Sequence, residues 1–319
     1  MKFMPFLNTP WGIFAFILLL GVITVNGFTD APTSITSAVI TKSLIMKKAC
    51  ILSALFNLAG VIFGSFLGMG VSKAIAELGD TGTNKEMCAC LLTVIIFGVV
   101  TWLLGMPSSE SVALISALCA VSYFESGKVK TNILVSILIF TVMCCIMSFL
   151  LSLLSYFAIR KAPVKYRGLH IALCSLSSFI HGWQDGGKFI GLFLILGGFN
   201  DTSTDFLLIL PCVLTVSAFM CLGTLLGGER IVKELGENTV KLKDSSCAAS
   251  DIGCLLSLFI CTLLGIPTST GYAKSTAIMG AGIGDGEKIN KKSALMQIGT
   301  CLATIPICFL LGYFLCCLL

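Results

Sequence analysis

Blocks of apolar residues long enough to cross a lipid bilayer recur along this whole chain of 319 residues. A bilayer core takes about 20 residues as a helix, and the block 133–159 carries no charged residue. In all, 56% of the residues are hydrophobic and 12% are charged, with a mean hydropathy of +0.99, whereas soluble domains carry about a quarter charged residues. Membrane β-barrels show short alternating strands instead of such solid blocks. The sequence therefore predicts an integral membrane protein made of helices.

The apolar segments form two sets of six. They fall at 11–26, 31–46, 49–70, 87–105, 110–124 and 131–158, and again at 168–182, 187–199, 206–227, 247–265, 270–284 and 293–319. Between the sets, the loop 160–167 holds four cations and no acid, so it should face the cytoplasm. We predict an all-α fold of about 10–12 transmembrane or half-membrane helices, with an N-terminal repeat (1–159), a basic cytoplasmic linker (160–167) and a C-terminal repeat (168–319).

The two sets carry matching motifs in the same order. The matches pair Asn26 to Asp30 with His181 to Asp185, Gly64 and Gly68 with Gly223 and Gly227, Lys73 to Gly79 with Arg230 to Gly236, and Leu103 to Ser109 with Leu263 to Ser269. The offsets are 155, 159, 157 and 160 residues, nearly constant along the chain. Chance similarity rarely gives such order, so we infer an internal duplication, a hallmark of secondary transporters.

The relative direction of the two copies depends on the number of crossings in each half. Six full crossings would make the copies parallel, and an odd number would invert them. Segments 110–124 and 187–199 are too short to cross comfortably, and half-helices or re-entrant segments would allow inversion. We expect inverted repeats, and the parallel arrangement stays open.

Charged residues and cysteines argue against several other classes. The net charge of +5 lies mostly in short loops, which suits membrane orientation and not nucleic-acid binding. The 16 cysteines lack zinc-site spacing, and there are only two histidines, so no metal or redox cofactor is expected. Only Lys2 precedes the run 11–25, and no small-residue cleavage pattern follows. We therefore read this run as the first membrane helix and not as a removed signal peptide.

Asp30 and Asp185 are the first candidate functional residues. Each follows a glycine and lies between two apolar segments. Because a carboxylate at membrane depth is costly unless a cation, a proton or water compensates it, the pair indicates a coupling site for Na⁺ or H⁺, with both aspartates as candidate Na⁺ ligands. The alternative is a pair of helix caps in loops at the water interface, as Pro32 and Thr33 after Asp30 would suggest.

Two matching turns predict an anion site. In 105–111 and 265–270, glycine ends one helix, proline opens the next, and hydroxyls lie where the new helix presents unpaired N–H groups. A single turn of this kind is usually an ordinary connection, but two copies beside the aspartates favour anion binding. The candidate anion contacts are Ser108, Ser109, Thr268, Ser269, Thr270, Lys188 and Thr33.

Other polar residues lie close to these motifs or within apolar segments. Lys188 follows Asp185 within one helical turn, so it could pair with that carboxylate or offset the charge of a dianion. For Lys188 and Lys274 the alternative is snorkelling to the surface. The remaining coupling-ion candidates are Asp251, Gln184 and Asn26. The paired glycines at 64, 68, 223 and 227 are read as helix-packing positions.

At these residues the chain resembles the inorganic phosphate transporter (PiT) family, as a divergent member of bacterial type. Each half of that family carries a Gly-x-Asn-Asp signature and a later Gly-x-Pro-x-Ser-Thr-Thr-His signature. The stretch His181 to Gly191 looks like the bacterial form His-Gly-x-Asn-Asp-Gly-Gln-Lys-x-x-Gly, and Asn26 to Thr36 is similar to the first-half form. The chain departs from the family pattern at Thr29 and Gln184 (asparagine in the family), at Val112 and Tyr272 (the final histidine), and at Asn57 and Asp251 (an intramembrane glutamate).

The resemblance implies proton- or sodium-coupled phosphate symport across the cell membrane on an inverted-repeat helical fold. It also implies Asp30, Asp185 and Asp251 as coupling-ion candidates, with Ser109 and Ser269 among the anion contacts. The expected partners are phosphate or a similar oxyanion and membrane lipid. The sequence allows a homodimer but does not specify an oligomeric state, and it leaves the choice between Na⁺ and H⁺ open.

Three alternatives remain. A sulfate or other oxyanion permease could share this fold, and a receptor or assembly subunit could bind an anion without transporting it. The third is an intramembrane aspartyl protease, because 282–285 matches its Gly-x-Gly-Asp pattern. That chemistry needs a second aspartate, usually after tyrosine, and no Tyr-Asp pair occurs; Asp285 also reads as part of an exposed loop.

Overall fold

The computed structural model describes residues 5–67, 71–72, 75, 83–106, 108–129, 131–163, 165–197, 206–226 and 228–319, and within these ranges it is helical without any β-strand. After a short 3-10 turn, η1 (Pro5–Asn8), the first half contains α1 (Pro10–Thr29), α2 (Pro32–Ile40), α3 (Met46–Leu67), α5 (Asn84–Leu103), α6 (Glu110–Ser126) and α7 (Thr131–Ile159). The second half contains α8 (Tyr166–Gly197), α9 (Phe206–Leu226), α10 (Glu229–Lys233), the π-helical η2 (Glu234–Asn238), α11 (Asp244–Leu263), α12 (Thr270–Gly284) and α13 (Lys291–Leu318).

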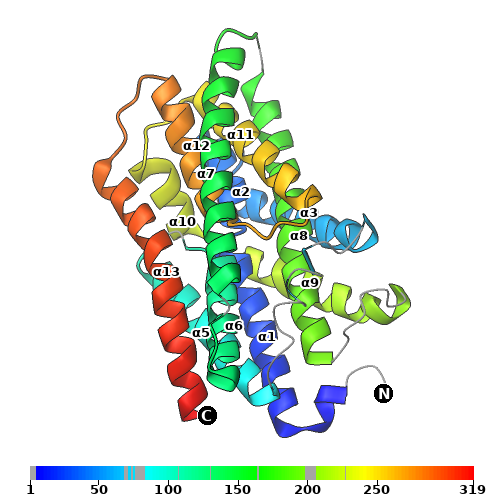
Figure 1. The fold of residues 1–319 in the computed structure, drawn as a ribbon. Helices are drawn as coiled ribbons and strands as arrows, with labels where there is room; N and C mark the ends of the chain where they lie inside the picture. Colours follow the sequence, from blue (N-terminus) through cyan, green and yellow to red (C-terminus); the bar gives the residue numbers. More distant parts are fainter. Residues whose placement is uncertain are drawn as a thin grey trace.

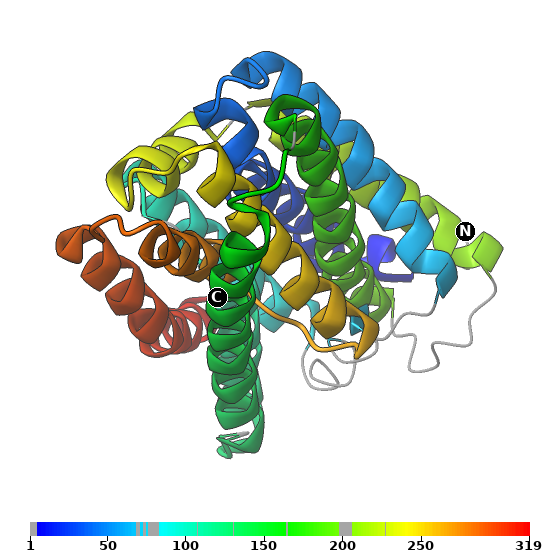
Figure 2. The same ribbon diagram turned by 90° about the horizontal axis from the view of Figure 1, so that it is seen from above.

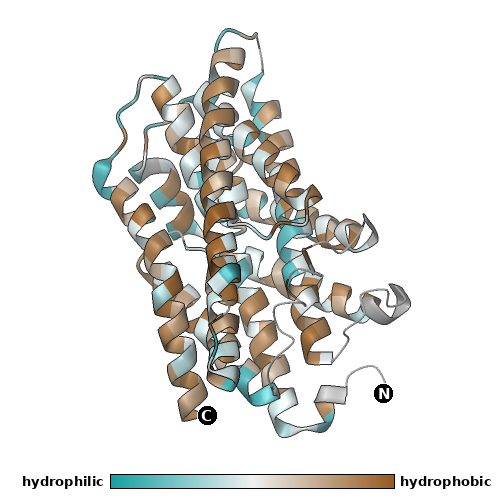
Figure 3. Cartoon of the chain, in the orientation of Figure 1, coloured by the Kyte–Doolittle hydropathy of each residue, from teal (hydrophilic) through white to brown (hydrophobic). Residues whose placement is uncertain are grey.

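Six of the described helical stretches are long and apolar enough to span a membrane, or seven if the bent pair α9–α10 counts as one span. Figure 3 shows that α7 and α13 are mostly apolar and that hydrophilic residues gather in the connecting loops. Only 22% of the most apolar window of α7 and of α13 is buried, against 67% for α11. Helices α7 and α13 are therefore outer helices that face lipid.

The repeats are inverted, as expected. In Figure 1, α7 rises to the connection with α8 at the top, while its counterpart α13 descends to the C-terminus at the bottom. The hairpin of α5 and α6 occupies the lower half, and its counterpart of α11 and α12 occupies the upper half. Each hairpin enters and leaves at the same end and so makes no net crossing. Because α1 and α2 form one candidate span (Pro10–Ile40) and α8 is one helix, each half is left with an odd number of crossings, which produces the inversion.

The repeats exchange their last helices. Helix α7 packs against α11 and α12 of the other half, and α13 packs against α5 and α6. The view in Figure 2 shows α7 standing beside α11 and α12, away from α3. Each hairpin is thus held by the last helix of the opposite repeat, which gives two helical groups that meet through the hairpin turns.

Proline explains where the first helix breaks. Helix α1 ends at Thr29, and α2 begins at Pro32, because proline supplies no N–H and clashes with the preceding turn. The sequence predicts separate segments at 168–182 and 187–199, but their described residues, up to Gly197, form the single helix α8. That prediction is wrong because Gly186 and Gly187 keep their backbone N–H groups and allow the helix to continue. Asp30 therefore lies at a break, and Asp185 lies inside a helix.

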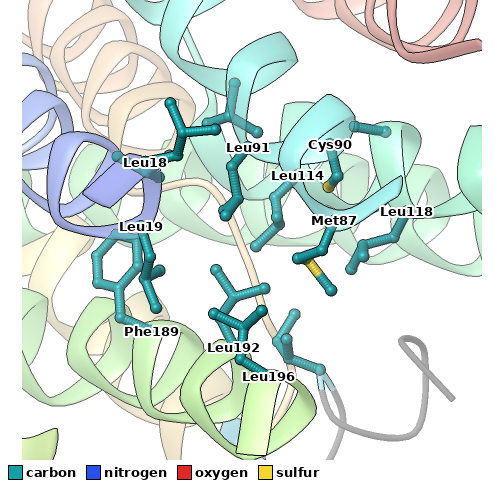
Figure 4. Packing of buried hydrophobic residues seen from close by; sticks show 14 of the residues in the cluster. Leu18, Leu19, Met87, Cys90, Leu91, Leu114, Leu118, Phe189, Leu192 and Leu196 are labelled. Atoms are coloured by element: carbon teal, nitrogen blue, oxygen red, sulfur yellow. The ribbon is translucent and has the colours of Figure 1, made fainter. Parts of the chain in front are cut away.

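A leucine-rich core lies on one side of the centre. Helices α1, α5, α6 and α8 contribute to it, and Figure 4 shows the side chains of Leu19, Leu91, Leu114 and Leu192 turned toward one another. These leucines are at most 2% exposed. This part of the molecule is packed as a dry apolar cluster.

Paired glycines permit close helix crossings where they are described. A Cβ on Gly223 of α9 would lie 2.2 Å from the carbonyl oxygen of Thr24 in α1, and one on Gly64 of α3 would lie 2.2 Å from the ring of Trp183. Gly68 and Gly227, and most of the motif at 73–79, lie outside the described residues.

Asp285 does not lie in a freely exposed loop, in contrast to the interpretation from the sequence. Its carboxylate is 7% exposed, accepts a hydrogen bond of 2.8 Å from the hydroxyl of Tyr156, and lies 3.3 Å from the ammonium group of Lys243. Hydrogen bonds to Glu287 and Asp285 raise the pKa of Lys243. The expected exposed loop is not found because α7 is long enough to place Tyr156 against Asp285 in the turn after α12.

Candidate functional site

Asn26 joins the two motif aspartates. Its side-chain amide donates to Asp185 Oδ2 at 2.8 Å and to Asp30 Oδ2 at 3.2 Å. Asp30 is 3% exposed and Asp185 is fully buried. The inverted packing of α1 beside α8 thus brings together two aspartates that are 155 residues apart in the sequence. They lie in the protein interior and not in loops at the water interface.

Glu110 is a third carboxylate of this cluster, and it is not among the predicted site residues. The Thr29 hydroxyl donates to Glu110 Oε1 at 2.6 Å. Glu110 is 4% exposed, and its Oε2 atom is buried with no hydrogen-bond partner among the described residues. The available signal was a glutamate that opens an apolar segment, since residues 111–124 carry no charge.

Lys188 lies inside the cluster and does not snorkel to the surface. Its ammonium group is 2.5 Å from Asp185 Oδ1, donates to the Thr268 carbonyl at 3.1 Å, and also contacts the Ser111 hydroxyl. The ring of His181 adds a contact of 3.4 Å between its Nε2 atom and Asp185 Oδ2. Among the residues that the structure describes, three carboxylates therefore face one lysine in this cluster, which leaves an excess of negative charge when all four groups are ionised.

The two predicted turns meet at the centre of the molecule. The Ser111 hydroxyl, at the start of α6, donates to the Thr268 carbonyl just before α12 at 3.0 Å. Gly105 and Gly265 both have φ of +68°, the left-handed conformation that ends a helix. The N-termini of the two short helices consequently point toward one shared region.

The predicted serines of the turns also cap helices. Ser109 accepts a hydrogen bond from Val112 N at 3.3 Å, and Ser269 accepts one from Tyr272 N at 3.2 Å. As an N-cap, each oxygen acts as an acceptor, and each hydroxyl proton remains available to an anion. The functional and structural interpretations of these serines are therefore compatible.

The hydroxyl groups next to the two capping serines differ in whether they still have a proton to donate to a ligand. Ser108 accepts from Thr101 at 2.9 Å, and Thr268 accepts from the Gln184 amide, so both retain a proton. The Thr33 hydroxyl donates to the Asp30 carbonyl at 2.7 Å and is already used. Thr270 Oγ1 is buried, with no hydrogen-bond partner among the described residues. Thr270 is consequently the best placed of these hydroxyls to hold a ligand.

Asp251 belongs to a different cluster from Asp30 and Asp185. Its Oδ1 atom contacts the ammonium group of Lys274 and accepts from the Ser37 hydroxyl at 2.7 Å. Lys274 is 3% exposed, so this lysine does not snorkel either. Hydrogen bonds within this second cluster connect α2, α11 and α12.

The oxygen atoms of the central cluster suit a hard monovalent cation. Among the described residues, no three side chains of His, Cys, Asp and Glu are arranged to hold a metal ion together. Asn26 Oδ1 and Glu110 Oε2, however, are both buried oxygens without a partner in this part of the chain. Amide, hydroxyl or carbonyl oxygens, which are hard ligands, would complete the coordination shell of a cation bound here.

Inverted repeats that bring helix N-termini and buried carboxylates to one centre define a secondary transporter of a small ion. Residues 26–167 and 160–312 each match the phosphate transporter family. The chain therefore belongs to the phosphate transporter family, and it is a multi-pass membrane carrier and not an enzyme. The double match also agrees with the duplication inferred from the motifs.

Individual relatives are similar over most of the chain. A protein of Rhizobium meliloti (strain 1021) named "Probable low-affinity inorganic phosphate transporter" is 33% identical over 290 residues, covering 84% of this chain and 86% of the relative. A Bacillus subtilis (strain 168) protein of the same name is 26% identical over 309 residues, covering 90% and 91%. A solved structure named "The sodium-dependent phosphate transporter" has a TM-score of 0.81 at 16% identity, covering 96% of this chain and 98% of that one. The structural likeness shows a shared fold.

Proposed function

We propose that this protein carries inorganic phosphate across the cell membrane in symport with Na⁺, at the centre where the two hairpin turns meet. The observation that carries the proposal is the contact between Ser111 and Thr268, because it places two helix N-termini beside the Asp30 and Asp185 cluster. The names of the relatives support phosphate as the substrate, and the sodium dependence named for the structurally similar transporter supports Na⁺.

The anion would bind at the N-terminus of α12. Unpaired N–H groups and the positive end of the helix dipole attract an oxyanion there. The Thr270 hydroxyl is buried and without a partner in the described structure, and the Ser269 and Thr268 hydroxyls each retain a proton to donate. Lys188 contacts the Thr268 carbonyl at 3.1 Å and would supply a positive charge beside the anion.

The coupling cation would bind on the first-repeat side of the cluster. In the part of the chain that the structure describes, no lysine pairs with Asp30 or Glu110, and Lys188 is paired with Asp185. Thr33 occupies the position of Lys188 in the first repeat, at the offset of 155 residues. A cation held by Asn26 Oδ1, Asp30 and Glu110 Oε2 would balance their charge and favour binding of the anion nearby.

Transport would follow from movement of the two helical groups. One contains α5, α6 and α13, and the other contains α7, α11 and α12. The two hairpins meet through Ser111, Lys188 and Thr268, so a ligand at this point touches both groups. Rocking of one group against the other would expose the centre to each side of the membrane in turn.

Uptake by purified protein in liposomes, with sodium and pH gradients imposed independently, tests the proposal. Labelled phosphate should accumulate under an inward sodium gradient, and excess unlabelled phosphate should block it while excess sulfate does not. Accumulation driven by a pH gradient alone would instead assign H⁺ as the coupling ion. Competition by sulfate equal to that by phosphate would favour a general oxyanion permease, and failure to move any oxyanion would leave a binding protein.

A further inference from the structure

The cluster around Asp251 is a buried ion pair held by two serines. Asp251 is 1% exposed and Lys274 is 3% exposed. The Lys274 ammonium group donates to Ser37 at 3.1 Å and to Ser250 at 3.4 Å, in addition to its contact with Asp251. Asp251 Oδ2 is buried without a partner among the described residues. The carboxylate is thus buried and is neutralised by a side chain of the protein itself.

The other repeat has no charge at the positions that the motif offsets make equivalent, and none at Asn57, where the resemblance puts the family glutamate of that half. The offset of 160 residues places Leu91 opposite Asp251 and Leu114 opposite Lys274, and the offset of 155 places Leu192 opposite Ser37. These three leucines lie in one apolar cluster, and Figure 4 shows them together with Cys90, the counterpart of Ser250. The helical framework can therefore be packed at these positions without any ion pair.

Stability does not explain the ion pair. A buried salt bridge is often no more stabilising than well-packed apolar residues of similar size, whereas a buried charge without its partner is strongly destabilising. Leucines fill these positions in the other repeat, so the acid is not required for packing. Because Asp251 is a buried carboxylate within the membrane-spanning part of the protein, however, a positive charge must accompany it.

The two acidic clusters obtain their positive charge differently. Among the described residues of the central cluster, Asp30, Glu110 and Asp185 share the ammonium group of Lys188 and the ring of His181, so cations from solution would balance the remaining charge. At Asp251 the hydroxyls of Ser37 and Ser250 and the carboxylate all contact the ammonium group of Lys274. Hydroxyl and carboxylate oxygens are also the kinds of ligand that bind hard cations. An ammonium group and Na⁺ both carry one positive charge, and both are bound by oxygen atoms.

We propose that the ammonium group of Lys274 is a tethered cation that takes the place of an exchangeable coupling ion at Asp251. This inference rests on ion-coupled symport as the function. Lys274 then fixes the coupling ratio, because Asp251 is neutralised in every step of the cycle and contributes no ion to transport. The exchangeable ions bind only at the central cluster.

Thermal melting of purified protein tests the proposal without any transport measurement. In K274M, Asp251 loses its tethered cation, so Na⁺ or a proton should bind there. The melting temperature should then rise with Na⁺ at constant ionic strength, or with falling pH, by on the order of 3 °C more than it does in the wild type. K274R, which restores a cation, and D251N/K274M, which removes the acid, should match the wild type. Equal Na⁺ and pH dependence of K274M and wild type would overturn the proposal.

A second variant decides the question if K274M does not fold. D251L/K274L installs the leucine pair of the first repeat, and it should carry the same number of cations per phosphate as the wild type in liposomes. A lower ratio would show that Asp251 itself takes part in ion coupling, and the proposal would fail. If the wild type moves no phosphate, the proposed function fails, and the melting comparison still decides the role of Lys274.

Discussion

The Asn26 amide donates to the Asp185 carboxylate at 2.8 Å across 159 residues of sequence, and to Asp30 at 3.2 Å. One neutral side chain thus holds two acids of opposite repeats in a fixed geometry. Removing the amide leaves the two carboxylates to repel each other in a buried environment, where charge interactions are weakly screened.

We therefore expect N26A to bind the coupling cation about tenfold more weakly, since hydrogen bonds to charged groups contribute about 1.5–3 kcal/mol. A sodium titration of phosphate uptake measures this change. N238A is a suitable control, because the exposed Asn238 amide donates at 2.7 Å to Glu234 in the same short helix and not to the central cluster. An unchanged sodium dependence of uptake in N26A would show that Asn26 is not part of the coupling site.

Asp185 pairs with Lys188 at 2.5 Å within the buried cluster. Removing one partner of such a buried pair costs about 3–5 kcal/mol of stability, so D185N should melt at a lower temperature than the wild type. Phosphate uptake per folded protein should fall by at least about 100-fold, because the site loses a charge that binds the coupling ion. D285N is the matched control, since Asp285 lies at the far end of α12 and contacts Tyr156 and Lys243. Wild-type uptake by D185N would exclude this aspartate from the mechanism.

Glu110 can be tested with a substitution that keeps its shape. E110Q retains an oxygen that accepts from Thr29, but it loses the charge that would attract a cation. We expect about a tenfold loss of apparent cation affinity, with near-normal uptake at saturating sodium. If E110Q and wild type have the same sodium dependence, Glu110 has only a structural role.

The hydroxyls at the start of α12 should separate into two types. T270V removes a hydroxyl that has no partner in the described structure, so it should weaken phosphate affinity about tenfold without lowering the melting temperature. S269A removes an N-cap, so it should also cost about 0.5–2 kcal/mol of stability. Competition uptake and thermal melts measure the two effects. An unchanged phosphate affinity in both variants would rule out the helix N-terminus as the anion site.

Two glycine substitutions test the close crossing of α1 and α9. A methyl group at Gly223 would lie 2.2 Å from the Thr24 carbonyl, so G223A should be destabilised by about 1–3 kcal/mol. Gly299 in α13 has nothing within 4 Å of the same position, so G299A should melt at or slightly above the wild-type temperature. Equal melting temperatures for the two variants would contradict the crossing.

The sequence by itself determined the features that depend on neighbours along the chain. Apolar runs specify membrane helices because every backbone polar group in lipid must be bonded within its own segment. Glycine, proline and serine specify the turns before Ser111 and Thr270, since these residues end one helix and cap the next. The recurrence of Asp30 as Asp185 identified the duplication and one pair of acids at the site.

The tertiary structure alone decided which polar residues meet. Glu110 joins Thr29 only because the α5–α6 hairpin turns back beside the end of α1. Asp251, a coupling-ion candidate from the sequence, is paired with Lys274, since α11 and α12 lie antiparallel and bring the two residues together. Hydropathy and capping are local properties of the chain, whereas the partner of a buried charge depends on how the helices pack over separations of 23 to 159 residues.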